Sequence, residues 1–143
     1  MTPPFLLVLS AFAMVLLSAL VAVRLLVVRT REMRRKRVHP QAASTSIQMA
    51  ARLEDVQAAE NFRNLFEVPV LFYALVATAL ATAHTPGWLV AGAWVFVGLR
   101  VAHSVIHCTY NTVMHRFAVF MLGFAVVVGL WTALVISLMG RSA

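Results

Sequence analysis

The chain has 143 residues, of which 62% are hydrophobic and only 12% are charged, and its mean hydropathy is +0.86. This small number of charged side chains cannot cover the surface of a soluble domain. We therefore exclude soluble enzymes and soluble binding proteins. We predict an all-α integral membrane protein that forms one domain over residues 1–143, a bundle of four transmembrane helices.

The charge of the chain is strongly basic and unevenly distributed. Twelve Lys and Arg residues stand against five Asp and Glu, which gives a net charge of +7. In a soluble chain this excess would indicate a nucleic-acid partner. Here seven of the twelve basic residues lie within residues 29–59, the pattern of a cytoplasmic loop. We therefore predict that this loop contacts lipid headgroups, and we expect no nucleic-acid partner.

The first predicted span covers residues 5–28, an apolar run of 24 residues that only Arg24 interrupts. A helix of that length rises about 36 Å, enough to cross a hydrocarbon core of about 30 Å. Arg24 lies close enough to the end of the run to extend its charge to the interface. Because the basic loop follows this span, we predict that the N-terminus is outside the cytoplasm.

A helix is predicted to begin after the loop, because Thr45 and Gln48 have the spacing of a capping box. We expect it to continue to about residue 83 as one long helix, kinked at Pro69, with the second span at residues 62–83. A short turn at residues 84–87 then leads to the third span.

The third and fourth spans are predicted at residues 88–108 and 117–139, with a short cytoplasmic loop at residues 109–116 between them. Four spans return the chain to the side on which it started. We therefore predict a multi-pass membrane protein with both termini outside the cytoplasm.

Polar side chains enter the membrane at the start of the second span. The apolar residues 68–83 cover only about 24 Å, so Glu67 is expected within the edge of the bilayer. At 100° per residue, Glu60, Asn64 and Glu67 lie within about 60° of one another, and Arg63 lies beside them. A carboxylate at this depth needs a partner, which makes this stripe a candidate site.

The third span has a polar face of its own, formed by Arg100, His103, Ser104, His107 and Asn111, which fall within about 100° on a helical wheel. Such a face must point to the bundle interior or to a subunit interface. The depth of Arg100 permits an ion pair with Glu67. Arg116 is predicted at the N-terminus of the fourth helix, where unpaired backbone N–H groups favour anions.

These residues resemble the family of membrane-associated proteins in eicosanoid and glutathione metabolism, which includes microsomal glutathione transferases and prostaglandin E synthase. The resemblance rests on Asn64-Leu-Phe-Glu67 with Pro69, on Arg-Val-Ala-His-Ser at residues 100–104, and on Arg116 sixteen residues after Arg100. It extends over nearly the whole chain. It implies a homotrimer of four-helix subunits that hold glutathione between neighbours and act on a lipophilic small molecule.

Carried over residue by residue, the resemblance makes Arg116 the catalytic residue that stabilises the thiolate. It places the following residues in the glutathione site: Arg63, Asn64, Glu67, Arg100, His103, Ser104 and His107. Two positions depart from the family pattern. Glu60 stands where an arginine is usual, one turn before Asn64, and His107 stands where a tyrosine is usual.

Two functions remain open from the sequence. The first is a membrane-embedded, glutathione-dependent transferase or peroxidase that acts on lipophilic electrophiles. The second is a non-enzymatic protein of the same fold that binds a lipid or a protein partner in its groove, with Glu67 and Arg100 as a structural ion pair. We do not predict a metal site, because His103 and His107 lack a third ligand.

Overall fold

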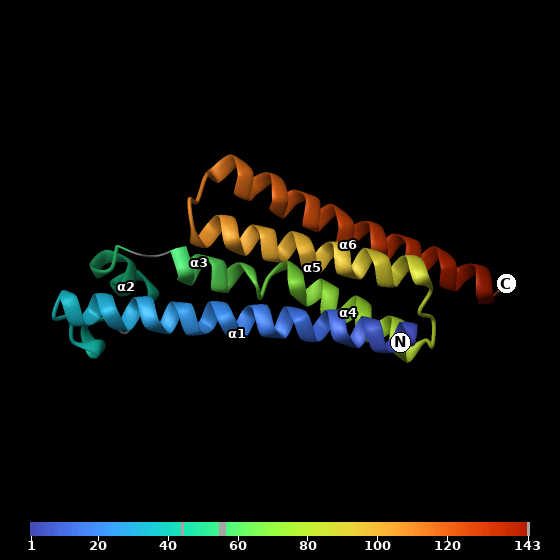
Figure 1. The fold of residues 1–143 in the computed structure, drawn as a ribbon, viewed down its shortest axis with the longest axis horizontal. Coiled ribbons are helices and arrows are strands. Elements are labelled where there is room, and N and C mark those ends of the chain that lie inside the picture. Colours follow the sequence, from blue (N-terminus) through green and yellow to red (C-terminus); the bar gives the residue numbers. More distant parts are fainter. Residues whose placement is uncertain (44, 55–56, 143) are drawn as a thin grey trace.

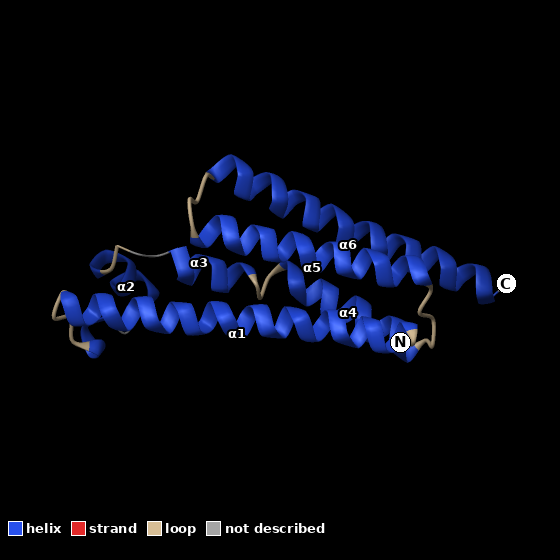
Figure 2. Cartoon of the chain, in the orientation of Figure 1, coloured by secondary structure: helices blue, strands red, loops and turns tan. Residues whose placement is uncertain are grey.

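The structure, a computed structural model, describes residues 1–43, 45–54 and 57–142. Its elements are all helical and follow one another along the chain (Figures 1 and 2): α1 (Pro3–Arg35), the short 3-10 helix η1 (Pro40–Ala43), α2 (Ser46–Arg52), α3 (Gln57–Asn64), α4 (Val68–Ala81), α5 (Gly87–Cys108) and α6 (Val113–Ser142).

Four segments are long and apolar enough to cross a membrane: Pro3–Arg35, Gln57–Ala81, Gly87–Cys108 and Val113–Arg141. Each overlaps one of the four predicted spans, so the prediction of an all-α, four-span membrane protein is confirmed. Figure 1 shows both termini at the same end of the bundle. At the other end lie η1, α2 and the turn between α5 and α6.

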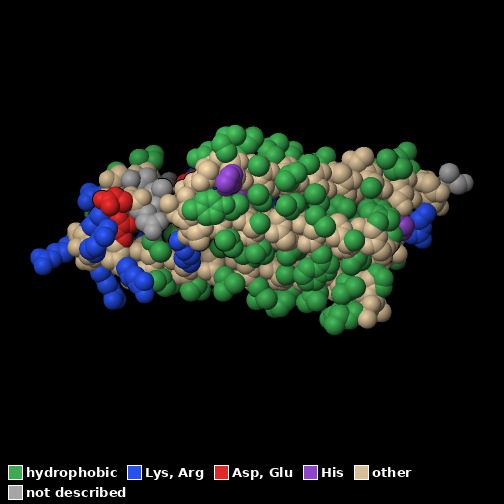
Figure 3. Space-filling view, turned by 45° about the horizontal axis from the view of Figure 1, so that its top comes forward, with side chains coloured by type: hydrophobic (Ala, Val, Ile, Leu, Met, Phe, Trp, Pro, Cys, Tyr) green, Lys and Arg blue, Asp and Glu red, His purple; other side chains and the backbone are tan. Residues whose placement is uncertain are grey.

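The first helix shows why the bundle suits a lipid environment. Its buried residues in the first six turns, Leu7, Ser10, Met14 and Val21, recur at spacings of three, four and seven, which places them on one face. Large apolar side chains on its other faces, such as Phe12 and Leu20, are exposed. Figure 3 shows apolar side chains over the body of the molecule and most basic side chains gathered at one end. This distribution matches a membrane-embedded body with a basic end in water.

The core lies where α1, α4, α5 and α6 meet. Phe72 of α4 stacks on Phe96 of α5 with ring centroids 4.6 Å apart, and both rings are fully buried. Trp131 of α6 donates from Nε1 to the backbone oxygen of Leu71 at 2.9 Å. The stacked rings join α4 to α5, and the tryptophan joins α6 to α4. Helix α5 bears most of the buried polar residues described below.

The second span is broken rather than kinked. Helix α3 ends at Asn64, α4 begins at Val68, and Glu67 between them has φ −94° and ψ −90°, which is not helical. Pro69 lies in the first turn of α4, where a missing N–H is tolerated, but it cannot continue the hydrogen bonding of a preceding turn. The prediction of one continuous helix with a kink is therefore wrong at this point.

The predicted beginning of that helix is only partly right. The capping box forms, because Thr45 accepts from the Gln48 N–H and the Gln48 side chain accepts from the Thr45 N–H. However, α2 ends at Arg52 and Leu53 is extended. Likewise, α6 begins at Val113, so the helix starts within the stretch predicted as a loop over residues 109–116.

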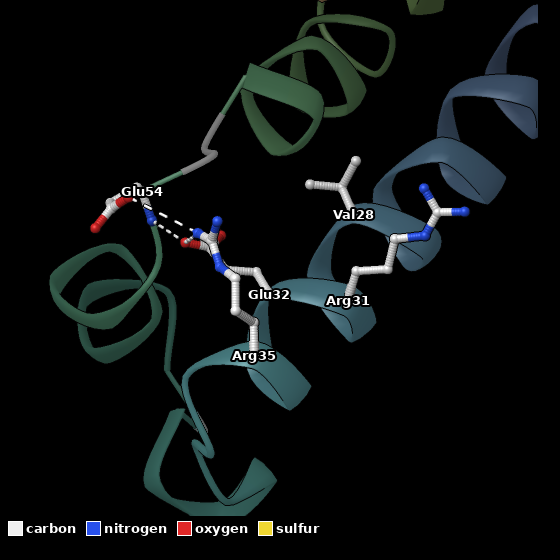
Figure 4. A pocket seen from close by; sticks show the side chains of 5 residues that line it. All are labelled: Val28, Arg31, Glu32, Arg35 and Glu54. Carbon is white, nitrogen blue, oxygen red and sulfur yellow. Dashed lines mark hydrogen bonds and ion pairs between the residues drawn. The ribbon is translucent and has the colours of Figure 1, made fainter.

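Ion pairs and hydrogen bonds between charged side chains join the end of α1 to the segment after α2 (Figure 4). Glu32 is buried and accepts from the backbone N–H of Glu54 at 2.7 Å. Lys36 lies 3.1 Å from the Glu32 carboxylate and 2.9 Å from that of Glu54, and these hydrogen bonds, the one to Glu54 first, raise the pKa of Lys36. Figure 4 shows Glu54 beside Glu32 and Arg35, while Arg31 points away. The segment that follows α2 is therefore held against the end of α1.

Candidate functional site

A cluster of buried polar side chains lies in the half of the bundle nearest the basic end. Four of its members lie on α5, where their spacing predicts a single face, and all four are buried on the inner side of that helix. The fifth comes from α3. The cluster consists of Asn61, Arg100, His103, Ser104 and His107. Polar groups in such a place are costly unless they are hydrogen-bonded. The partners of each member therefore show what the cluster can do.

Arg100 is the largest fully buried side chain, with 1% of its surface exposed. Its guanidinium carbon lies 5.2 Å from the centroid of Phe96 and 5.0 Å from that of Phe120. Nη2 donates to the Phe120 backbone oxygen over a long 3.5 Å contact, and Nε and Nη1 are buried without a partner. Gly123 of α6 makes room for the group, since a Cβ there would lie 2.9 Å from Nη2.

The predicted ion pair between Glu67 and Arg100 is not formed. Among the residues that the structure describes, no carboxylate is paired with Arg100, and Glu67 is exposed on the outside of the bundle. The helical wheel on which Glu67 faced inward assumed an unbroken helix. The helix is broken before Val68, so that assumption does not hold. Arg100 is held by aromatic rings instead, which attract a cation through their π faces.

Arg116 lies in the first turn of α6, as predicted, and its backbone N–H bonds to the Thr112 oxygen. Its Nη1 donates to the Asn111 side-chain oxygen at 3.0 Å and to Nε2 of His107 at 3.3 Å. Its backbone oxygen accepts from Nδ1 of His103 at 3.2 Å. The site therefore holds Arg116 between the two histidines of α5 and the turn that follows α5.

The tautomers of both histidines follow from these contacts. A carbonyl oxygen can only accept, so Nδ1 of His103 bears the proton. An arginine can only donate, so Nε2 of His107 is the unprotonated nitrogen. The other nitrogen of each ring, Nε2 of His103 and Nδ1 of His107, is buried without a partner.

The turn between α5 and α6 gives Arg116 its position. Asn111 has φ +47°, a left-handed conformation that Asn adopts more readily than most residues. Its backbone N–H bonds to the Ile106 oxygen at 2.9 Å and closes the end of α5. Asn111 is thus outside the α5 polar face on which the sequence placed it, yet its amide still reaches the site.

A cleft of about 160 Å³ opens beside this cluster, lined by Asn64, His103, Val113, Arg116, Phe117 and Phe120. Three of the predicted site residues, Asn64, His103 and Arg116, therefore meet around one cavity. His107 lies behind Arg116 through the contact described above. The cleft joins α3, α5 and α6, and Arg116 in its wall has no ion pair with an acidic side chain among the described residues. The cavity therefore offers an anion a positive, partly apolar environment.

The remaining predicted residues lie elsewhere. Arg63 is exposed and pairs with Glu60 at 3.4 Å on the outside of α3. Ser104 faces away from the cleft and donates to the side-chain oxygen of Asn61 at 3.3 Å. Asn61 in turn donates to the Cys108 sulfur at 3.3 Å. Asn61 is fully buried and was missed, although its position one turn before Asn64 on an otherwise outward polar helix could have indicated it.

The cluster does not resemble a metal centre. Within residues 1–43, 45–54 and 57–142, no three His, Cys, Asp or Glu side chains come together as metal ligands. His103 and His107 face each other edge to face with ring centroids 5.7 Å apart, and each is engaged with Arg116 instead.

Fold and site together define an integral membrane protein of four helices with a buried cationic cluster near one end of the bundle. The profile of the MAPEG family matches residues 4–136, and the chain belongs to that family. It is thus a membrane protein of the glutathione and eicosanoid family. No curated protein and no solved structure matches the chain significantly.

Proposed function

We propose that the protein is a membrane-embedded, glutathione-dependent transferase or peroxidase that acts on lipophilic electrophiles. The observation that carries this proposal is the position of Arg116, in the first turn of α6, on the wall of a cleft it shares with Asn64 and His103. A thiolate is favoured by a nearby cation and by the N-terminus of a helix; Arg116 supplies the cation, and Val113 in the same wall begins α6.

The chain's own residues fit the charge of glutathione. The tripeptide brings two carboxylates and, when activated, a thiolate, and the cluster holds Arg100 and Arg116 without an acidic ion-pair partner among the described residues. Arg100 also has two buried donors without acceptors. Glutathione would supply the nucleophilic sulfur, and the role of the protein is to hold it, favour its deprotonated form and exclude water.

We infer from the small size of the cleft that neighbouring copies share each site, and a homotrimer is the assembly that the family resemblance implies. Ligand pockets usually have about 300–1,000 Å³, and this one has about 160 Å³ within a single subunit. Glu60, Arg63 and Glu67 lie on the outer surface next to it, where lipid would be an unfavourable neighbour. A second copy packed there would enlarge the cavity and cover these charges. Native mass spectrometry from mild detergent tests this proposal, and a monomer would contradict it.

Orientation completes the proposal. We infer that the basic loop and the turn before α6 are cytoplasmic and that both termini are outside, because the basic residues gather at one end of the bundle (Figure 3). The cleft then opens near the cytoplasm, where a water-soluble thiol can reach it, while an apolar electrophile enters from the bilayer. Labelling of single-cysteine variants in intact cells with an impermeant reagent tests this, and a loop cysteine labelled from outside would overturn it.

The decisive experiment is the Arg116→Ala substitution. A charge-assisted contact of this kind is worth about 1.5–3 kcal/mol, so conjugation of an aryl halide should slow by about one to two decades. In that reaction the thiolate sulfur bonds to the ring carbon and halide leaves, while the thiol proton goes to solvent. The thiolate absorbance of bound glutathione should shift to higher pH. Arg141→Ala at the far end of α6 is the control, and it should change neither quantity.

The alternative is a non-enzymatic protein of the same fold whose groove binds a lipid or a partner protein. The buried, hydrogen-bonded position of His107, where the family usually has a tyrosine, favours this alternative. If the purified protein shows no bound thiolate near neutral pH, no turnover and no thermal stabilisation by glutathione, the enzyme proposal is refuted.

A further inference from the structure

A second groove lies on the opposite side of α5 from the cleft. It has about 270 Å³ and is lined by Leu17, Leu20, Val21 and Arg24 of α1, by Ser104, Val105 and Cys108 of α5, and by Thr109 directly after α5. The α1 residues recur at spacings of three, four and seven, so they form one face of that helix. The groove shares no lining residue with the cleft.

The groove has a polar end and an apolar end. Helices α1 and α5 pack together and run in the same direction (Figure 1), so Arg24 lies beside Cys108 and Thr109 at the end of α5. Leu17 lies about 10 Å farther into the bundle, by the rise of a helix. The polar end is therefore near the membrane surface and the apolar end points to the bilayer interior.

Arg24 supplies a positive charge that the protein itself does not neutralise. Its Nη2 donates to the backbone oxygen of Cys108 at 2.7 Å, which satisfies a free carbonyl at the end of α5. Its Nη1 is buried and has no hydrogen-bond partner, and among the described residues no acidic side chain pairs with Arg24. An uncompensated cation at the mouth of an apolar groove is complementary to an anionic amphiphile.

We propose that this groove is a binding site for an anionic phospholipid of the adjacent leaflet. The phosphate lies at Arg24 and Thr109, and one acyl chain lies along Leu17, Leu20 and Val105. The rim of the groove favours a lipid occupant, because Leu20 is 69% exposed and Val105 is 54% exposed, continuous with the apolar outer surface. The direction of the groove matches a lipid that stands with its headgroup at the interface.

The native Cys108 provides the assay, because it is the only cysteine of the chain and lines the groove. The protein is reconstituted into nanodiscs of phosphatidylglycerol or of phosphatidylcholine, and its rate of modification by N-ethylmaleimide is measured. One charge-assisted hydrogen bond changes occupancy by about tenfold. We therefore expect modification about tenfold slower in phosphatidylglycerol, and retention of that lipid in native mass spectra.

Matched variants separate the charge from the shape of the groove. Arg24→Gln should abolish the difference between the two lipids, and Arg24→Lys should retain it. Arg29→Gln, which removes a basic residue outside the groove lining, should behave as wild type. Leu20→Trp fills the groove and keeps the charge of Arg24, so it should remove the bound lipid even if Arg24→Gln proves unstable.

Three results would overturn the proposal. The first is equal modification of the wild type in both lipids. The second is protection of Cys108 by added oleate alone, which would indicate a free fatty acid instead of a phospholipid. The third is slow modification in every lipid together with cross-linking of two chains through Cys108 by a bis-maleimide, which would show that a second copy covers the groove.

Discussion

Gly123→Ala is the substitution that tests the packing around the buried cation. A Cβ at this position would lie 2.9 Å from Nη2, 3.4 Å from Nε and 3.5 Å from Cζ of Arg100. The first distance is shorter than side chains tolerate, so the guanidinium or α6 has to move. The rings of Phe96 and Phe120 lie at 5.2 Å and 5.0 Å and limit where the guanidinium can go.

The cost follows from two opposing effects. Overpacking of a closed core destabilises by about 1–3 kcal/mol, whereas replacing a helical glycine by alanine contributes about 0.5–1 kcal/mol in the other direction. Gly129→Ala is the matched control, because it lies on the same helix and a Cβ there meets nothing within 4 Å. The difference between the two variants isolates the clash at about 1–3 kcal/mol.

Thermal unfolding of both variants in the same detergent measures that difference. At about 2–4 °C per kcal/mol for a chain of this size, the midpoint of Gly123→Ala should lie about 2–12 °C below that of Gly129→Ala. Combining Gly123→Ala with Arg100→Lys should recover part of the loss, since lysine has no planar group at that position. Equal midpoints for the two alanine variants would refute the packing described around Arg100.

Three further predictions concern other parts of the bundle. Trp131→Phe removes the hydrogen bond to the Leu71 oxygen and should lower the unfolding free energy by about 0.5–1.5 kcal/mol, measured by thermal unfolding in detergent. Thr45→Ala removes the cap of α2 and should speed amide hydrogen exchange there, at a local cost of about 0.5–2 kcal/mol, without moving the global midpoint. The raised pKa of Lys36 means that its stabilising contact with Glu54 is present below the ordinary pKa of 10.5 and is lost as the pH rises through the higher folded value. Cleavage within residues 37–54 by a protease that does not recognise lysine should therefore become faster at strongly alkaline pH in the wild type. A Lys36→Gln variant that still shows this increase would contradict the prediction.

The number of spans followed from composition and length, because a bilayer requires continuous apolar runs. The polar face of α5 followed as well. Its residues recur within an unbroken helix, where a rotation of 100° per residue holds from Arg100 to His107. Arg116 was placed at the start of α6 by the same logic, since the last apolar run begins beside it.

The second span shows where that logic stops. Pro69 indicated a disturbance, but proline permits either a kink or a complete break, and only the surrounding packing decides between them. Because α3 and α4 are separate helices, a single helical wheel cannot predict which side chains of the two face the same way. Asn61 then proves to be the inward residue, fully buried, and Glu67 is left outside.

The partner of Arg100 could not be predicted for a related reason. Opposite charges at similar depth suggested an ion pair, yet the rotation of each helix about its axis decides which side chains meet. Here Phe96 and Phe120 enclose the guanidinium, and the missing side chain of Gly123 creates the space. Neither the rings nor the glycine had any polar signature that would have singled them out.

The break in the second span divides a membrane helix into two rigid halves joined by a short non-helical segment at residues 65–67. A continuous helix resists bending along its length, whereas here the segment can absorb a change of angle by rotation about a few backbone bonds. Helix α3 is joined to α5 by the hydrogen bonds of Asn61 with Ser104 and Cys108, whereas α4 packs in the apolar core. The two halves of the span can therefore differ in direction, each set by its own neighbours.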